Sequence, residues 1–254
     1  MTKIRVVARL DVKNDFVIKG IHFDGLRKIG NPNNIARKYY LQGVDEIIFI
    51  DAVASYFGRN SLYDVIKSTC ADVFVPITVG GGIKTLGEIT LAFESGADKV
   101  AINTAGVHNP QLLVEASEKY GSQSIISSIV AKKVASQKWE VFTENGREPT
   151  GLDVIEWARQ VEKLGVGEIL LSSVDRDGTK KGFDIDLCQQ VMNCVEIPVI
   201  LSGGAGSVND IVKLSELVKP SAIAVGSILH YDISNVPSIK SSLFTNGHSV
   251  RGVK

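Results

Sequence analysis

Two glycine-rich turns carry the clearest chemical signal in the sequence. Each follows a short apolar run containing a proline: residues 75–79 lead into Gly80-Gly81-Gly82, and residues 197–201 lead into Ser202-Gly203-Gly204. An apolar run that ends in glycines is typical of a buried strand opening into a turn. Glycine also lets backbone N–H groups approach an anion without interference from a side chain. We therefore expect phosphate to bind at both turns.

The two turns belong to an internal repeat. Pro76 and Pro198 are 122 residues apart (198 − 76), and the same shift places residues 43–47 on 165–169 and residues 100–105 on 222–227. Repetition at one offset indicates a duplicated half, because the period is too long for a solenoid. Chance similarity among apolar strands is the alternative, although the glycines and glutamates align as well. The last pair of segments leads us to add Asn103, Thr104, Gly226 and Ser227 to the phosphate-binding residues, unless these are ordinary strand-to-helix turns.

Carboxylates and one amine follow strand-like segments and could transfer protons or bind anions. Asp11 and Asp51 each end an apolar run, and Asp177 precedes Gly178. We predict Asp11 as the acid–base residue and Asp177 as a supporting one, although Asp11 could cap a turn and Asp177 could form an Asx turn. Lys19, in a polar loop, would be a solvated charge by default, but a lid that brings one cation to a phosphate suits an enzyme. The role of Asp51 stays open.

Strand-like and helix-like segments alternate along the chain and must position these residues. The strands are expected at residues 4–10, 46–50, 73–79, 98–102, 124–130, 168–172, 197–201 and 222–225. The helices are expected at residues 32–43, 61–70, 86–95, 110–120, 152–164, 186–193, 208–218 and 236–244, with Thr85 as an N-cap. Residues 131–150 are interpreted as an inserted β-hairpin around Asn145-Gly146. Eight such units predict an α/β fold, a (β/α)8 TIM barrel, as a single domain over residues 1–254 with half-barrels at about 1–122 and 123–254.

Composition excludes several classes of function. The 254 residues are 44% hydrophobic, and 28 basic residues balance 28 acidic ones, so nothing indicates a nucleic-acid binder and any phosphate site must be local. Cys70, Cys188 and Cys194 have no metal-ligand spacing and form no obvious pairs, which fits a reducing cytoplasm. No apolar run approaches the length of a membrane span. We expect a cytoplasmic protein with no metal, no cofactor and no membrane contact.

Four charged residues fall at the opposite ends of the expected strands. Because active sites of such barrels lie at the C-terminal ends of the strands, charges at the N-terminal ends favour a stabilising role. The side chains should form one ring of two acids and two bases, made of Arg5, Glu46, Lys99 and Glu168.

Five motifs together resemble one enzyme family from end to end. They are Leu10-Asp11-Val12-Lys13 with Lys19-Gly20, Thr78-Val79-Gly80-Gly81-Gly82-Ile83, Asp98-Lys99-Val100-Ala101-Ile102-Asn103-Thr104, Asp175-Arg176-Asp177-Gly178-Thr179 and Ser202-Gly203-Gly204-Ala205-Gly206. The pattern resembles the cyclase subunit (HisF) of imidazole glycerol phosphate synthase. The resemblance implies that ammonia from a HisH-type glutaminase attacks a bis-phosphorylated ribulosyl aminoimidazole carboxamide. The products would be imidazole glycerol phosphate and an aminoimidazole carboxamide ribotide, and the pathway histidine biosynthesis.

The resemblance also assigns the charged ring and the partner. In the family, the matching ring of Arg5, Glu46, Lys99 and Glu168 gates ammonia entry from a glutaminase docked on that face. Asp98 matches the docking surface. We therefore expect a heterodimer in which ammonia crosses the barrel to Asp11, whereas a purely structural salt-bridge belt is the alternative.

One position departs from the family pattern. The family uses two aspartates as acid–base groups: Asp11 matches the first, and Val130 stands in place of the second. Valine can neither donate nor accept a proton, and the loss of one positioned acid–base group typically costs about 10²- to 10⁴-fold in rate. The chain could be a weakened cyclase helped by Asp177 or water. It could instead be a paralogue that passes ammonia to another reaction, such as amidination of a cell-surface sugar, or a non-catalytic activator of the glutaminase. The related sugar isomerase of the histidine pathway fits less well, because it needs two aspartates and no ammonia.

Overall fold

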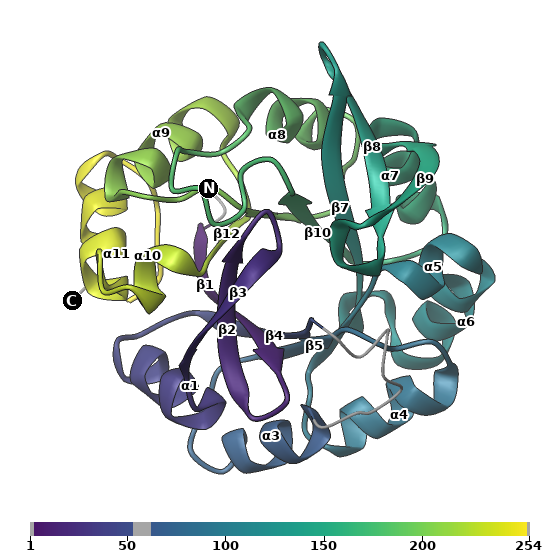
Figure 1. Ribbon diagram of the computed structural model, residues 1–254, viewed down its shortest axis with the longest axis horizontal. Helices are drawn as coiled ribbons and strands as arrows, with labels where there is room; N and C mark the ends of the chain where they lie inside the picture. The colour runs from purple at the N-terminus through teal and green to yellow at the C-terminus, as the bar shows by residue number, and fades with distance from the viewer. Residues whose placement is uncertain (1–2, 53–61, 253–254) are drawn as a thin grey trace.

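The computed structural model describes residues 3–52 and 62–252. Eight parallel strands form a closed barrel, because each pairs with the next and the last pairs with the first. Helices surround it in a ring (Figure 1), which confirms the predicted (β/α)8 TIM barrel. In barrel order the strands are β1 (Arg5–Lys13), β4 (Glu46–Asp51), β5 (Ile77–Gly80), β6 (Lys99–Ile102), β7 (Ile125–Ala135), β10 (Glu168–Ser173), β11 (Val199–Ser202) and β12 (Ala222–Val225).

The helices follow the strands much as the sequence pattern predicts. Two short helices, α5 (Thr104–His108) and α10 (Ser227–His230), were not expected. The others are α1 (Pro32–Leu41), α3 (Leu62–Thr69), α4 (Leu86–Glu94), α6 (Gln111–Tyr120), α7 (Val154–Lys163), α8 (Ile185–Met192), α9 (Val208–Val218) and α11 (Val236–Thr245). Within the described part of the chain, no helix is long and apolar enough to cross a membrane.

The 122-residue repeat extends to the ends of the helices. Helices α1 and α7 begin at Asn31 and Asp153, whose side chains accept hydrogen bonds from the first turn. Helices α4 and α9 begin at Thr85 and Ser207, and both carry a capping box. Each pair differs by 122 in number (153 − 31 and 207 − 85). The same local chemistry therefore starts the corresponding helix in both halves.

An apolar layer fills the middle of the barrel. Inward-facing residues from alternate positions of the strands pack together there, and all are almost completely buried. The layer separates the N-terminal end of the barrel from its C-terminal mouth. Its members are Val7, Ile48, Ala101, Ile126, Leu170, Ile200, Ala222 and Ala224.

The sequence predicts a polar loop after the first strand, and this prediction is wrong. Strand β1 continues to Lys13, turns at Asn14 in the left-handed conformation (φ 51°), and pairs antiparallel with β2 (Phe16–Ile21). Strand β2 then pairs with β3 (Asp24–Gly30), and the β2–β3 hairpin lies across the centre of the barrel in Figure 1. Lys19 is 4% exposed rather than solvated. A buried lysine breaks the apolar alternation by which a strand is recognised, so this segment resembles a loop in sequence.

The inserted segment forms more than one hairpin. Strand β7 extends past Val130 to Ala135 and pairs with β8 (Lys138–Thr143), which pairs with β9 (Glu148–Asp153). The predicted turn at Asn145-Gly146 is confirmed, with φ values of 56° and 81°. The β7–β8 hairpin projects beyond the ring of helices in Figure 1.

Candidate functional site

Three of the predicted site residues meet at the C-terminal mouth of the barrel. The Nζ of Lys19 lies 3.1 Å from Oδ2 of Asp11 and 2.8 and 2.9 Å from the two carboxylate oxygens of Asp177. All three residues are at least nine-tenths buried. The structure therefore brings together residues far apart in the sequence. The ammonium group of Lys19, which belongs to the β2–β3 hairpin, contacts both carboxylates.

The hairpin is held in this position by the loop that carries Asp177. The backbone N–H of His22 donates to the carbonyl of Asp177 at 2.9 Å, and Nδ1 of His22 lies 2.8 Å from the carbonyl oxygen of Val174. Gly178, in the left-handed conformation (φ 71°), packs so closely on the hairpin that a Cβ there would lie 2.0 Å from the carbonyl oxygen of Gly20. Glycine is therefore required at position 178 for the hairpin to close. The motif around Asp177 also led us to expect Gly178 among the phosphate-binding residues, and that role stays a prediction.

Arg9 is a central residue of the site that the sequence analysis missed. It is 5% exposed, and its Nε donates to Oδ1 of Asp11 at 2.9 Å. Its Nη1 donates to the hydroxyls of Ser172 at 2.7 Å and Ser202 at 3.3 Å. The spacing could have revealed Arg9 as a site residue. It stands two residues before Asp11 on the same strand, so both side chains face the barrel interior.

Opposite charges control the ionisation of these groups. Burial acts to raise the pKa of Asp11, but the Arg9 guanidinium and the Lys19 ammonium hold it well below its ordinary value. Burial acts to lower the pKa of Lys19, but the carboxylates of Asp11 and Asp177 raise it above its ordinary value. Arg9, Lys19 and Asp11 therefore stay charged. In this arrangement Asp11 is a carboxylate and not a proton donor.

Val130 lies in a small apolar cluster at the same mouth. It is 7% exposed and packs with Phe23 of the β2–β3 hairpin, Phe142 of β8 and Val174 of the loop after β10. Position 130, where the resemblance implies a second aspartate, is therefore surrounded by apolar side chains on these sides. Phe23 also lies under the Arg9 guanidinium, with Cζ 5.3 Å from the ring centroid.

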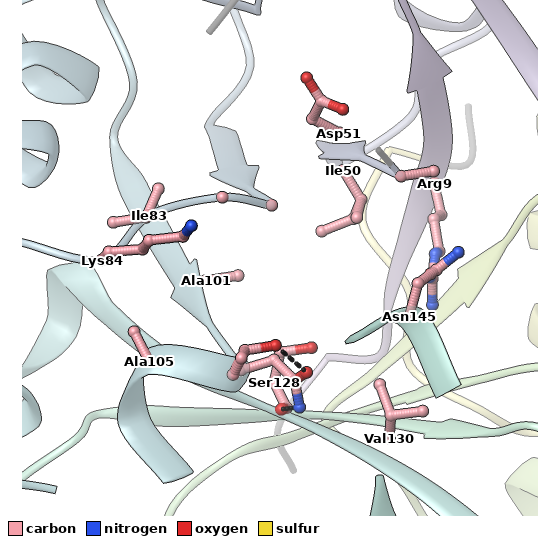
Figure 2. A pocket seen from close by; sticks show the side chains of 15 residues that line it. Arg9, Ile50, Asp51, Ile83, Lys84, Ala101, Ala105, Ser128, Val130 and Asn145 are labelled. Atoms are coloured by element: carbon pink, nitrogen blue, oxygen red, sulfur yellow. Dashed lines mark hydrogen bonds between the residues drawn. The ribbon is translucent and has the colours of Figure 1, made fainter. Parts of the chain in front are cut away.

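The first glycine turn borders a cavity of about 70 Å³. Gly81 and Gly82 line it with φ values of 93° and 71°, and a Cβ on Gly81 would lie 2.2 Å from the carbonyl oxygen of Asp51. Asn103 and Thr104 line the cavity too. Figure 2 shows Arg9, Asn145 and Val130 facing Ile83 and Lys84 across it.

The side chains of Asn103 and Thr104 are already hydrogen-bonded within the protein. The Asn103 amide donates to the carbonyls of Ser128 at 2.9 Å and Phe142 at 3.2 Å. The Thr104 hydroxyl donates to Oδ1 of Asn103 at 3.3 Å and accepts from the backbone N–H of Glu144 at 3.2 Å. These side chains fix the loops around the cavity, so the groups left for a ligand at this turn are mainly backbone N–H groups.

The second glycine turn borders a matching cavity. Gly203 and Gly204 have φ values of 102° and 114°, and a Cβ on Gly204 would lie 2.2 Å from the carbonyl oxygen of Gly182. The hydroxyl of Ser227 is buried and has no hydrogen-bond partner among the described residues. It is thus a donor available to a ligand. The cavity is lined by Arg9, Lys19, Asp177, Gly178, Ser202, Gly203, Gly204, Gly226 and Ser227, among others.

The four charges at the N-terminal end form a closed ring. Arg5 bonds to Glu46 at 2.6 Å and to Glu168, and Lys99 bonds to Glu46 at 3.2 Å and to Glu168 at 2.9 Å. Burial acts to lower the pKa of Arg5, but Glu168 and Glu46 raise it above its ordinary value. Asp98, directly before Lys99, is exposed on this end and accepts from the backbone N–H of Ile77 at 2.8 Å.

Other groups near the mouth have structural partners. His230 is 8% exposed, with Nδ1 2.8 Å from the Tyr39 hydroxyl and Nε2 3.1 Å from the carbonyl oxygen of Arg9. Burial and the nearby Lys19 ammonium lower the pKa of His230 to about 4, so it is neutral at physiological pH. Among the described residues, no group of three or more His, Cys, Asp or Glu could hold a metal ion.

Comparison with known proteins places the chain in a family. The model of the histidine biosynthesis protein family matches residues 5–235. A HisF subunit of imidazole glycerol phosphate synthase from Legionella pneumophila is 52% identical over 210 residues, which cover 83% of this chain and 99% of that protein. The chain belongs to the HisF family of histidine biosynthesis proteins. HisF subunits from Bacillus cereus (strain G9842) and Sulfurisphaera tokodaii are 46% and 45% identical, over 94% and 99% of this chain and 95% and 100% of theirs.

Membership of the HisF family agrees with the geometry of the mouth. The pattern that led to the family included Asp11, Lys19 and Asp177, and these are the side chains that converge. Arg9 and Val130 adjoin them on the Phe23 ring. The side chains that converge are therefore among those on which the resemblance rested.

Proposed function

We propose that the chain is the cyclase-type subunit of an imidazole glycerol phosphate synthase. It would use ammonia from a glutaminase on a bis-phosphorylated ribulosyl aminoimidazole carboxamide, and it would release imidazole glycerol phosphate and an aminoimidazole carboxamide ribotide. The observation that carries the proposal is the pair of glycine turns, at Gly81-Gly82 and Gly203-Gly204. Their cavities are both lined by Arg9, which bonds to Asp11, and Lys19 and Asp177 line the second cavity. A ligand with a phosphate at each end would thread past Asp11.

Phosphate binding would use the groups that the fold leaves available. At the second turn, the unpartnered hydroxyl of Ser227 and the backbone beside Gly203 and Gly204 can donate to phosphate oxygens. Lys19 lines the same cavity and bonds to Asp177. A phosphate would take over Lys19 and so free the Asp177 carboxylate for proton transfer.

The proton transfers would rest mainly on Asp11. As an ionised carboxylate held by Arg9, it can orient ammonia and accept a proton from the ammonium group formed by the attack. Once Lys19 moves to a phosphate, Asp11 loses one of its two cations, which makes it a stronger base. Val130 offers no group for the second transfer, so Asp177 or a water molecule would supply it, at a lower rate.

We propose further that a HisH-type glutaminase docks on the N-terminal end of the barrel. Asp98 is exposed there beside the ring of Arg5, Glu46, Lys99 and Glu168. Ammonia would enter through this ring and cross the apolar layer, which favours the neutral molecule over ammonium. The assembly would be a cytoplasmic heterodimer.

The second candidate rests on Val130 alone, and the comparisons favour the cyclase over it. A mouth with one acid–base carboxylate fewer suits a paralogue that delivers ammonia to another acceptor, such as a sugar that becomes an amidine, or a subunit that only activates the glutaminase. Both alternatives keep the charged ring and the partner, and they differ from the cyclase in the chemistry above Asp11.

A comparison of three proteins tests the proposal. Wild type, Asp11→Asn and Val130→Asp are assayed with the ribulosyl substrate and a free ammonium salt, so that no partner is needed. We expect slow turnover by wild type, a loss of at least about 10²-fold for Asp11→Asn and a gain for Val130→Asp. Fast turnover by wild type with no gain from Val130→Asp would contradict the idea that Val130 slows the cyclase reaction. If none of the three reacts, the second candidate is favoured.

A further inference from the structure

The turn between β8 and β9, at Glu144–Gly146, lies against the mouth of the barrel. A Cβ on Gly146 would lie 3.2 Å from the side chains of Phe23 and Val174 and 3.6 Å from that of Val130. The turn therefore packs on the apolar cluster that these three residues form with Phe142. The inserted segment thus contributes to the mouth, beside the position where the second aspartate is missing.

Hydrogen bonds from β6 and α5 hold this turn in place. The Thr104 hydroxyl accepts from the backbone N–H of Glu144 at 3.2 Å, and the Asn103 amide donates to the carbonyl of Phe142 at 3.2 Å. Within the turn, Asn145 is in the left-handed conformation, with φ 56° and ψ 41°. Few residues other than glycine adopt this conformation, and asparagine is among those that tolerate it. The anchored backbone therefore sets the direction of the Asn145 side chain.

Asn145 stands between two cavities of the mouth. It lines the cavity of the first glycine turn, and it also lines a smaller cavity bounded by Asp11, Lys19 and Asp177. Among the described residues, Ala52 is the other one that lines both cavities, so Asn145 provides the polar side chain that they share. A ligand that extends from the first glycine turn to Asp11 therefore passes this side chain.

The Asn145 side chain is available to a ligand. Figure 2 shows it beside Arg9 on the wall of the first cavity. In the part of the chain that the structure describes, no group forms a hydrogen bond with its amide. The nearby charges are used differently, because Arg9 and Lys19 form ion pairs with Asp11 and Asp177. The amide therefore offers two N–H donors and a carbonyl acceptor, without a net charge, among charges that are already paired.

These properties favour a neutral group that is both donor and acceptor. A primary carboxamide presents an N–H beside a carbonyl oxygen, as the asparagine side chain does, so the two can form two parallel hydrogen bonds. A hydroxyl would form one bond in the same place. A carboxylate has no donor, and it would bring a negative charge toward Asp11 and Asp177, which disfavours it.

We propose that Asn145 binds the carboxamide group of the ligand. The inference rests on the proposed function, whose substrate carries a carboxamide, and it adds the residue that recognises this group. It also gives the ligand a direction: the ribotide phosphate lies at Gly81-Gly82, next to Asn145, and the other phosphate lies at Gly203-Gly204. Asn145 determines specificity in this account and takes no part in proton transfer.

A matched pair of ribotides tests the contact. Aminoimidazole carboxamide ribotide and aminoimidazole ribotide share the phosphate, the ribose and the aminoimidazole ring, and only the first carries the carboxamide. Their affinities are measured by calorimetry for wild type, Asn145→Gly and Asn145→Asp. Asn14→Gly is the control, because Asn14 is exposed, has a similar left-handed φ of 51° and lines neither cavity.

The expected pattern is specific to the side-chain amide. Wild type and Asn14→Gly should bind the carboxamide ribotide at least about tenfold more tightly than the ribotide without it, as two hydrogen bonds in a partly desolvated site predict. Asn145→Gly should bind both ribotides with equal affinity and keep the wild-type affinity for aminoimidazole ribotide. Asn145→Asp should lose most of the preference, because a carboxylate cannot donate to the carbonyl of the ligand.

Other results would overturn the contact. Equal binding of both ribotides by wild type, or a preference that survives in Asn145→Gly, contradicts it and leaves the proposed phosphate binding intact. If neither ribotide nor inorganic phosphate binds wild type, the proposed phosphate binding fails, and the carboxamide contact fails with it. Glycine adopts a φ of 56° without strain, so Asn145→Gly should fold. If near-ultraviolet circular dichroism shows that it does not, wild type and Asn145→Asp decide the question.

Discussion

Arg9 and Asp11 project into the barrel from the same face of β1, and Nε of the one donates to Oδ1 of the other at 2.9 Å. The pair changes how Asp11 should be viewed. A carboxylate that is bonded by a guanidinium and by the ammonium of Lys19 stays ionised and holds a fixed orientation. It can accept a proton, but it becomes an acid only after it has done so.

Anions should bind at both glycine turns. Crystals soaked in phosphate or sulfate should show one anion beside Gly81 and Gly82 and another beside Gly203, Gly204 and Ser227, because both turns have glycine backbones at positive φ. An anion at only one turn would argue against a bis-phosphorylated ligand.

Gly204→Ala should remove the second of these sites. The new Cβ would lie 2.2 Å from the carbonyl oxygen of Gly182 at a φ of 114°, so the turn must move. We expect a loss of at least about 3 kcal/mol in the free energy of unfolding and no measurable phosphate binding at this turn. Gly247→Ala is the control: its φ is 82°, but its Cβ would meet nothing within 4 Å, so it should lose about 1–2 kcal/mol and bind phosphate normally.

Lys19 and Asp177 should respond in opposite directions to removal of charge. Asp177→Asn should tighten phosphate binding at the second turn by about tenfold, because the phosphate no longer competes with a carboxylate for Lys19. Lys19→Met should weaken phosphate binding and also lower stability by about 3 kcal/mol, since Lys19 is the cation with which Asp177 forms its ion pair among the described residues. Calorimetry with inorganic phosphate and urea unfolding measure the two quantities. A weaker affinity in both variants would refute the competition.

His230 should make stability depend on pH between about 6.5 and 4. Its pKa is lowered to about 4 in the folded protein, whereas an unfolded chain has a value near 6.5. The unfolded state therefore binds a proton first as the pH falls, so the contribution is complete above about 6.5 and is lost on the way down to about 4. The loss amounts to about 3 kcal/mol. In His230→Gln the slope of unfolding free energy against pH in this window should flatten, as urea unfolding at a series of pH values would measure.

Lys99→Met should separate the use of glutamine from the use of ammonium. It opens the ring and leaves Glu46 and Glu168 with Arg5 alone. We expect a loss of about 1–3 kcal/mol in stability and a several-fold change in glutamine-dependent activity with a glutaminase candidate, but normal activity with ammonium salt. Lys38→Met controls for loss of a lysine. If the glutamine-dependent activity is unchanged, the ring is only structural. The same conclusion follows if no glutaminase candidate binds the chain or responds to it.

The sequence predicted the barrel well because its signals were local. Apolar runs, the glycine turns and the 122-residue repeat placed all eight strands, and Thr85 capped its helix as expected. Strand ends were less certain: the third strand starts at Ile77 rather than Val73, since residues 73–76 lack ladder partners. The β2–β3 hairpin was missed because its buried charge, Lys19, is stabilised only by carboxylates distant in the sequence.

The site was predicted in outline for the same reason. Residues with a recognisable pattern, such as Asp11 and Asp177, were found, and they do meet. Arg9 was not, because an arginine inside an apolar strand has meaning only when Ser172 and Ser202 are seen across the barrel. The partners of a buried charge are a property of the fold, which no local window of sequence contains.

The apolar layer inside the barrel has a consequence for how its two ends can change. The ring at one end contains two cations and two anions, and so does the cluster of Arg9, Lys19, Asp11 and Asp177 at the mouth, so each cluster is electrically neutral as a unit. Arg5 and Arg9 are four residues apart on β1, or about 13 Å at the usual rise of a strand. Over such a distance the free-energy effects of substitutions should be additive, and a double variant of Lys99 and Lys19 would measure this. The ring and the mouth are thus separable modules, which is how one chain can carry valine at position 130 of its mouth and still keep an unbroken ring at its base.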